Sequence, residues 1–243
     1  MAKDKFTRKE FKYFVPIGYI EDLRQRVLGY AEYDPNCVDK TNHLYQVRSI
    51  YFDTIHYLFF YEKIEGVKIR KKLRIRTYDQ KEPNSIAFFE IKRKFNNEIY
   101  KERAKVRLDE VPELLNGDIL TEKTFESFQQ KSAFNKFIYL MKRLNLVPRV
   151  LVTYEREAFA VQDDSSTRLT FDLNTRSYPD PELEDIFREA DLKSFTDPYF
   201  ILEIKFFGRM PYWARQIVRD FHLHQEAISK YCKGLETWFP NLQ

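Results

Sequence analysis

The sequence has few of the features that mark several common classes of protein. Its 243 residues include only two cysteines, Cys37 and Cys232, which form no C-x-x-C pair, so neither a disulfide framework nor a cysteine metal centre is indicated. Six glycines and 16% aromatic residues argue against low-complexity and disordered classes. No apolar run approaches the roughly 18 residues needed to cross a bilayer, and the first residues lack a signal sequence. We therefore expect a soluble, cytoplasmic protein.

The sequence also lacks the G-x-x-x-x-G-K-[ST] motif, so any nucleotide is bound without a P-loop. The net charge is only +4, but the charge is unevenly distributed. Of the 41 Lys/Arg and 37 Asp/Glu residues, 15 and 6 lie in residues 63–107, which leaves 26 and 31 elsewhere. This local excess of cations indicates an anion site within the fold, and it argues against a nucleic-acid partner.

Charged and apolar side chains alternate along several expected strands. In the segment 68–78, Arg74 and Arg76 share one strand face, whereas Leu73 and Ile75 share the other. The pattern recurs in 86–95, 99–108 and 199–207. Because like charges on neighbouring strands repel, the repetition favours a sheet that surrounds an anion. The alternative is a charged face covered by water and salt bridges.

Periodicity and turn residues predict the order of elements. We expect strands at 6–14, 45–52, 68–78, 86–95, 99–108, 149–161, 166–174 and 199–207. We expect helices after Pro16, after Asp53-Thr54, at 122–146, from Pro211 and near 225–233, with a turn at Asn96-Asn97. No repeat or linker is visible, so residues 1–243 are expected to form a single domain.

Four acids share the charged faces with these cations: Glu10, Glu90, Asp172 and Glu203. Each could be an ion-pair partner of a neighbouring Lys or Arg. Each could instead bind Mg²⁺ or Mn²⁺, which bridge carboxylate and phosphate oxygens. Glu203 is the strongest metal candidate, because its strand is otherwise apolar and a buried acid there is costly without a role.

Short segments of the sequence, in order, resemble the CYTH superfamily of triphosphate tunnel metalloenzymes, and most closely its VTC subgroup, the polyphosphate polymerase domain. The segments are R-K-E-F-K-Y (8–13), S-I-Y-F-D-T (49–54), K-L-R-I-R-T-Y (72–78), F-E-I-K-R-K (89–94), Y-E-R-E-A-F (154–159), R-L-T-F-D (168–172), I-L-E-I-K-F (201–206) and S-K-Y (229–231). They extend over nearly the whole chain. The sequence has Arg8 where the superfamily pattern has an acid.

The resemblance implies an α+β fold in which a closed antiparallel β-barrel forms a tunnel, with helices packed outside. It implies that phosphates are held by Arg74, Arg76, Lys92, Lys94, Arg156, Arg168, Lys205 and Lys230. Glu203 would bind the metal. Lys12 and Arg103 are further substrate-binding candidates from the same faces, and Tyr154 and Ser229 would donate hydrogen bonds to phosphate oxygens.

The resemblance further implies a polymerase that transfers the γ-phosphoryl group of ATP to a growing polyphosphate chain, with Mn²⁺ or Mg²⁺ as cofactor. Two alternatives stay open: a metal-dependent triphosphatase of the same fold, and a non-catalytic polyphosphate-binding module. The expected partners are ATP and polyphosphate or triphosphate. No membrane segment is visible in the chain, although a membrane partner is possible.

Overall fold

The computed structural model of the chain describes residues 8–95, 98–116, 125–161 and 164–242. The chain divides into two compact units. The first comprises Met1–Gln46, Tyr154–Thr175 and Ser194–Ser229, and the second comprises Val47–Thr153, Arg176–Lys193 and Lys230–Gln243. Hydrogen-bonded strands follow the order β1-β10-β8-β7-β3-β4-β5-β6, and β7 and β8 contribute residues to both units.

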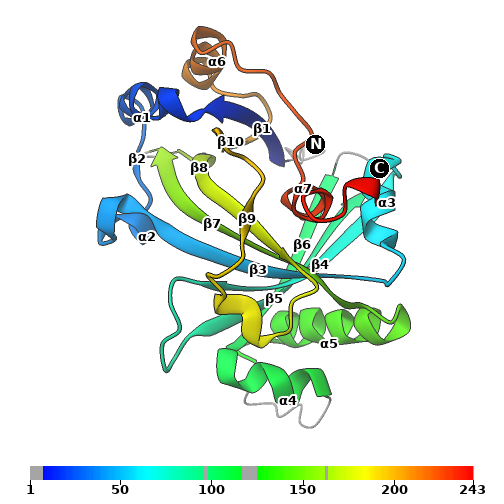
Figure 1. The fold of residues 1–243 in the computed structure, drawn as a ribbon. Helices are drawn as coiled ribbons and strands as arrows, with labels where there is room; N and C mark the ends of the chain where they lie inside the picture. The colour runs from blue at the N-terminus through cyan, green and yellow to red at the C-terminus, as the bar shows by residue number, and fades with distance from the viewer. Residues whose placement is uncertain (1–7, 96–97, 117–124, 162–163, 243) are drawn as a thin grey trace, which may run out of the picture. The chain divides into compact units, whose positions relative to one another are not determined.

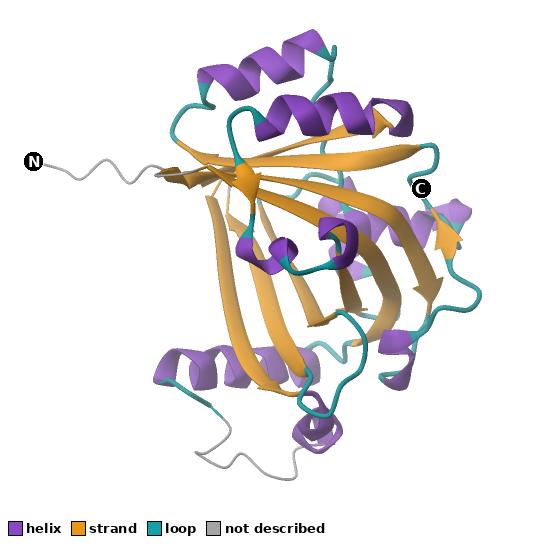
Figure 2. Ribbon diagram, turned by 90° about the vertical axis from the view of Figure 1, so that its left-hand side faces the viewer, coloured by secondary structure: helices purple, strands orange, loops and turns teal. Residues whose placement is uncertain are grey.

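The first unit is built on an antiparallel sheet with one apolar face. Its strands are β1 (Arg8–Pro16), β10 (Tyr199–Phe207), the first unit's parts of β7 (Val147–Val161) and β8 (Asp164–Pro179), and the short β2 (Glu32–Tyr33). Its helices are α1 (Ile20–Leu28), α2 (Pro35–Val38), α6 (Tyr212–Asp220) and the 3-10 turns Ile17–Tyr19 and Thr41–His43. The α1 and α6 helices lie side by side in Figures 1 and 2. Their apolar residues Leu23 and Ile217 are fully buried in one cluster with Leu202 of the sheet.

The second unit is built on four consecutive antiparallel strands. They are β3 (Tyr45–Asp53), β4 (Ile69–Tyr78), β5 (Ile86–Phe95) and β6 (Glu98–Arg107). The helices are α3 (Leu58–Ile64), α4 (Val111–Asn116), α5 (Phe128–Arg143) and α7 (Lys230–Glu236), with 3-10 turns at Leu108–Glu110, Glu184–Phe187 and Pro240–Leu242. Lys193–Ser194 forms the short strand β9, which pairs with β8.

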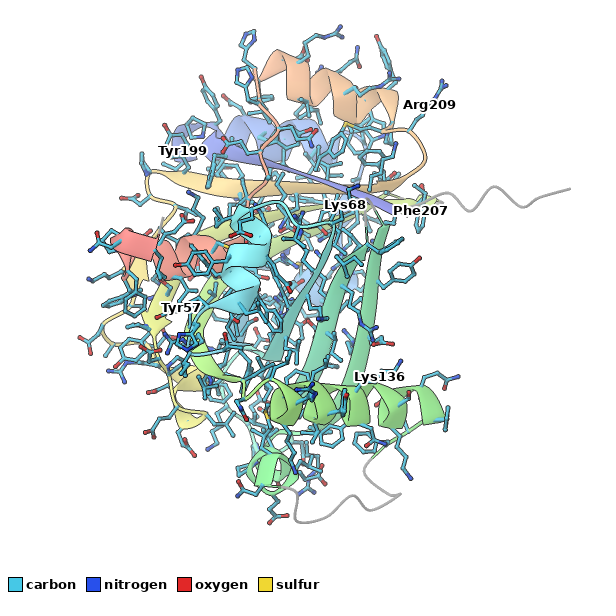
Figure 3. The ribbon with its side chains drawn as sticks, turned by 90° about the vertical axis from the view of Figure 1, so that its right-hand side faces the viewer. Tyr57, Lys68, Lys136, Tyr199, Phe207 and Arg209 are labelled. Atoms are coloured by element: carbon cyan, nitrogen blue, oxygen red, sulfur yellow. The ribbon has the colours of Figure 1, made fainter. Side chains whose placement is uncertain are left out.

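Helix α5 covers the apolar face of the second unit's sheet (Figure 3). The ring of Phe89 lies 5.0 Å, centroid to centroid, from the rings of both Phe134 and Phe137. Because neighbouring residues of a strand point to opposite faces, this packing leaves Glu90 and its strand-mates with the same parity on the other face. The sheet of this unit therefore has one buried apolar face and one charged face.

The predicted α+β class and antiparallel strands are confirmed, and the errors are local. The expected helix 122–146 was too long: α5 begins at Phe128, where the Ser127 hydroxyl accepts a hydrogen bond from Gln130 N. The helix expected near 225–233 begins at Lys230, and Gln225 instead forms a β-bridge with Tyr13. Helix α4 was not predicted.

Other expectations are not tested. The turn predicted at Asn96-Asn97 and the start of the expected helix 122–146 lie outside the described residues. Closure of the sheet into a tunnel and the single domain over 1–243 stay predictions.

Candidate functional site

In the second unit, the strand register places complementary and like charges in rows across the sheet. Arg74 lies opposite Tyr51 of β3 on one side and Glu90 of β5 on the other, and Glu90 lies opposite Arg103 of β6. Directly opposed residues of antiparallel strands share a face, so these four side chains project together. The predicted substrate residues Arg74 and Arg103 and the predicted acid Glu90 are thus brought together.

Glu90 is the centre of this group. Its side chain is 1% exposed, and its carboxylate contacts Arg74 Nη2 at 2.6 Å, Lys101 Nζ at 2.5 Å and Arg103 Nη1 at 3.9 Å. Burial raises the pKa of Glu90, but Arg74, Arg76 and Lys101 together lower it well below the ordinary value of a glutamate. Glu90 is therefore an ionised counter-charge for cations from two neighbouring strands.

Strand β3 orients the two arginines that the sequence placed in the site. Arg74 Nη1 donates to Tyr51 Oη at 2.8 Å, and Arg76 Nε donates to Ser49 Oγ at 2.9 Å. Burial raises the pKa of Tyr51, but the charges of Arg74, Arg76 and Lys72 lower it to about 8. Sequence reasoning did not include Ser49 and Tyr51 among the site residues, although their alternation with Ile50 and Phe52 was a usable signal.

Helix α7 brings Lys230 into the second unit. Lys230 is buried at the first position of α7. The next residue, Tyr231, packs its ring 5.3 Å from that of Tyr51, and its hydroxyl donates to the carboxylate of Asp53. That carboxylate also accepts hydrogen bonds from the backbone N–H groups of α3, so it ties α3 and α7 together. Sequence reasoning did not include Asp53 among the site residues.

The predicted cations Lys92 and Lys94 lie on the same face of β5 as Glu90. The register sets Lys92 opposite Lys72 and Lys94 opposite Arg70. Both lysines are partly buried. These pairs extend the charged face of the second unit along the strands, away from Arg76.

The first unit has its own carboxylate surrounded by cations. Glu203 is 4% exposed, and its oxygens lie 3.1 Å from Lys12 Nζ, 2.8 Å from Lys205 Nζ and 3.7 Å from Arg156 Nη2. Lys12 also contacts Glu10 at 3.1 Å. Burial lowers the pKa of Lys12, but Glu203 and Glu10 raise it above its ordinary value. For Lys205, burial prevails over Glu203, and its pKa is lowered.

The other predicted residues of the first unit lie in three different surroundings. Arg156 makes a two-point ion pair with Asp172 and lies 5.1 Å above the ring of the buried Tyr154. Arg168 lies opposite Lys205 in the register, but its guanidinium contacts Asp34 at 3.0 Å. Ser229 is buried at the end of the unit.

The predicted metal ligands do not assemble a metal site by themselves. A divalent cation such as Mg²⁺ takes about six oxygen ligands. Within the described ranges, no three His, Cys, Asp or Glu side chains are placed so that they could hold a metal ion. Each of the four predicted acids instead contacts Lys or Arg: Glu10, Glu90, Asp172 and Glu203. These residues do not fit a resident metal ion, and the predicted metal roles stay predictions.

Comparison with known proteins identifies the family. Residues 7–239 match the VTC domain. This chain belongs to the VTC domain family. The predicted resemblance to this family is therefore confirmed, and it extends over both units. No helix in the described part of this VTC domain is long and apolar enough to cross a membrane.

One curated relative and two solved structures are also similar to this chain. Vacuolar transporter chaperone complex subunit 4 of Schizosaccharomyces pombe is 25% identical to 98% of this chain, which spans only 38% of that relative. The solved structure of the PH1819 protein from Pyrococcus horikoshii OT3 aligns with a TM-score of 0.51 and 14% identity, covering 95% of this chain and 99% of that one. This second likeness supports the fold alone. A Hippeastrum protein, the putative adenylyl cyclase HpAC1, aligns with a TM-score of 0.47 and 11% identity over 96% of both chains, which is too weak to carry an argument.

Proposed function

We propose that this VTC domain is a polyphosphate polymerase that transfers the γ-phosphoryl group of ATP to the end of a growing polyphosphate chain. The proposal rests on the VTC family match and on one structural observation: the cations around Glu90 are held in position by side chains of their own sheet. Donors that are already oriented stabilise transferred phosphate without reorganising during the reaction. The closed tunnel implied by the family resemblance is part of the proposal.

In the proposed reaction, a terminal oxygen of the polyphosphate chain attacks the γ-phosphorus of ATP. The bond between that phosphorus and the β–γ bridging oxygen breaks, and ADP leaves with the electron pair. Arg74 and Arg76, oriented by Tyr51 and Ser49, bind oxygens of the transferred group. Mn²⁺ or Mg²⁺ would serve as the cofactor by arriving bound to ATP, and no carboxylate cluster of the described residues would hold it beforehand.

The decisive experiment is incubation of the purified chain with ATP and Mn²⁺, followed by measurement of polyphosphate, ADP and orthophosphate in the same sample. We expect long polyphosphate and ADP to accumulate together. Neither product should form when Arg74 and Arg76 are replaced by glutamine. Circular dichroism would check that the variant is folded. ATP consumption without polyphosphate would refute the proposal.

A triphosphatase is the second candidate, with water in place of the chain end. Orthophosphate in step with ADP would support it. The lowered pKa of Glu90 makes this carboxylate a weak proton acceptor for water, which favours the polymerase over a hydrolase that uses Glu90 as base. A binding module would retain polyphosphate without consuming ATP. Assembly with a membrane partner likewise stays a proposal.

A further inference from the structure

The charged face of the second unit does not end at Glu90. Two residues along β4 from Arg74, the register aligns Lys72, Lys92 and Lys101 in one row across three strands. Another two residues along, Arg70 lies opposite Lys94. The row that contains Glu90 mixes charges. The next row is cationic on all three strands, and the row after it has Arg70 and Lys94, with the apolar Ile99 on β6. Like charges directly opposed across strands destabilise a sheet, so the arrangement calls for an anion.

In the described part of the unit, contacts relieve the first of the two rows more than the second. Lys101 turns back to Glu90 at 2.5 Å, and the ammonium of Lys72 lies 5.7 Å from the ring centroid of Tyr231. In the outermost row, Arg70 Nη1 donates to the carbonyl oxygen of Val67 at 3.5 Å, and its charge acts on the carboxylate of Glu62, where it opposes the rise in pKa that burial causes. Lys94 is half-buried, and the charges that act on it are cationic. Burial, then Arg70, Lys63 and Lys92, lower the pKa of Lys94.

Helix α3 adds a further cation to this end of the sheet. The carboxylate of Glu62 accepts a hydrogen bond from the backbone N–H of Lys71 at 3.2 Å, which fixes the last turn of α3 beside β4. The next residue of that turn is Lys63, also partly buried. We call Lys63, Arg70 and Lys94 the outer cation cluster. It combines residues from a helix and two strands. Backbone hydrogen bonds join the two strands, and the hydrogen bond from the Lys71 N–H to the Glu62 carboxylate holds the helix beside them.

The outer cation cluster lies too far along the strand to serve the same three phosphates as Arg76. A strand rises about 3.3 Å per residue, so the six residues from Arg76 to Arg70 span about 20 Å. Three linked phosphates cover less than that distance, whereas a longer chain could contact every row. The succession of cations along β4 therefore suits an extended polyanion better than a triphosphate.

We propose that the outer cation cluster is a subsite for the phosphates of a polyphosphate chain beyond the first three. The inference deepens the proposed function and depends on it for the identity of the ligand. It gives Arg70 and Lys63 a role in recognising chain length. Lys94 completes the subsite from β5.

Binding measured by calorimetry without ATP tests this inference separately from catalysis. The probes are inorganic tripolyphosphate and a long-chain polyphosphate, and the variant is Lys63→Gln/Arg70→Gln in the full chain. We expect its affinity for long-chain polyphosphate to fall about tenfold at low salt, with tripolyphosphate affinity retained. The matched control is Lys142→Gln/Arg143→Gln, which removes the same charge from exposed positions of α5 in the same unit. Its binding of both probes should match the wild type.

Three results would overturn the proposal. The first is an equal loss of affinity for both probes, which would place the cluster at the triphosphate site. The second is the same loss in the control variant, which would reduce the effect to net charge. The third is retained binding of long-chain polyphosphate together with lost binding to vesicles of anionic lipid, which would make the cluster a lipid headgroup site. A further outcome is that the polymerase assay fails while the cluster variant still loses affinity for long-chain polyphosphate alone. That result would refute the proposed reaction and leave the subsite in place.

Discussion

Arg156 and Asp172 form a two-point ion pair: Nε donates to Oδ1 at 2.6 Å, and Nη2 donates to Oδ2 at 2.8 Å. Asp172 is fully buried, and burial would lower the pKa of Arg156, but Asp172 raises it well above its ordinary value. The carboxylate therefore fixes a guanidinium that also approaches Glu203 at 3.7 Å. The role of Asp172 in this structure is to hold the Arg156 guanidinium in place.

Replacing Asp172 with asparagine should lower the free energy of unfolding by about 3–5 kcal/mol, because the change leaves the Arg156 charge without its buried partner. Urea denaturation would measure the loss. The matched control in the same unit is Asp220→Asn, since Asp220 makes an exposed ion pair with Arg26, for which we expect at most about 1 kcal/mol. Equal effects of the two changes would contradict the assigned role.

Glu90→Gln tests the counter-charge of the second unit. The folded pKa of Glu90 is lowered, so its ionisation stabilises the fold above the ordinary glutamate pKa, and this contribution is lost as the pH falls toward the lowered value. We expect the difference in unfolding free energy between wild type and Glu90→Gln to be about 1–3 kcal/mol at pH 7 and to shrink at acid pH. The exposed Glu113 provides the control Glu113→Gln. A difference independent of pH would contradict the charge interaction.

The charged faces could be predicted from the sequence because successive side chains of a strand point to opposite faces, and Arg74 and Glu90 alternate with apolar residues. Their partners could not be assigned this way. The contact between Arg74 and Tyr51 depends on the register of β3 against β4, which local pattern does not fix. Similarly, the sequence does not indicate that the guanidinium of Arg168, which stays predicted to bind phosphate, contacts a carboxylate as distant in the sequence as Asp34.

Helix boundaries show the same limit. Phe125 continues the apolar spacing of α5 and packs its ring 5.1 Å from Phe134, but it lies before Ser127, which caps the helix. Apolar spacing reports which face is buried, whereas the cap decides where the helix begins. The role of Tyr231 could not be predicted from the sequence either, because its hydrogen bond to Asp53 joins residues that are 178 positions apart.

Tyr51 should act as an internal reporter of charge on the face of the second unit. Its pKa is lowered to about 8 by Arg74, Arg76 and Lys72 against the effect of burial, so a tyrosinate absorbance step near that pH should be present in the wild type and absent in Tyr51→Phe. Because the folded pKa lies below the unfolded one, ionisation favours the folded state increasingly from about pH 8 to about pH 10.

Two changes should move this step upward. Arg74→Gln removes a cation that contacts the Tyr51 hydroxyl, and bound tripolyphosphate neutralises the same cations from outside. A step that stays in place after both changes would show that the cations do not set the pKa of Tyr51. Arg93→Gln, on the opposite face of β5, is the control that should leave the step unaltered.

Glu203→Gln distinguishes a counter-charge from a metal ligand in the first unit. With metal chelated, the change frees Lys12 and Lys205 from a carboxylate that lies within about 3 Å of both. We expect tripolyphosphate to bind the variant more tightly than the wild type by about 1 kcal/mol, because the two freed ammonium groups can turn to the phosphate oxygens. Glu10→Gln, which removes an acid that contacts Lys12, should produce a smaller gain.

Calorimetry in the presence of chelator and then of Mn²⁺ would measure the tripolyphosphate affinity of both variants. If Mn²⁺ strengthens tripolyphosphate binding in the wild type but not in Glu203→Gln, then Glu203 holds the metal, and its ion pairs with Lys12 and Lys205 must open when the metal binds.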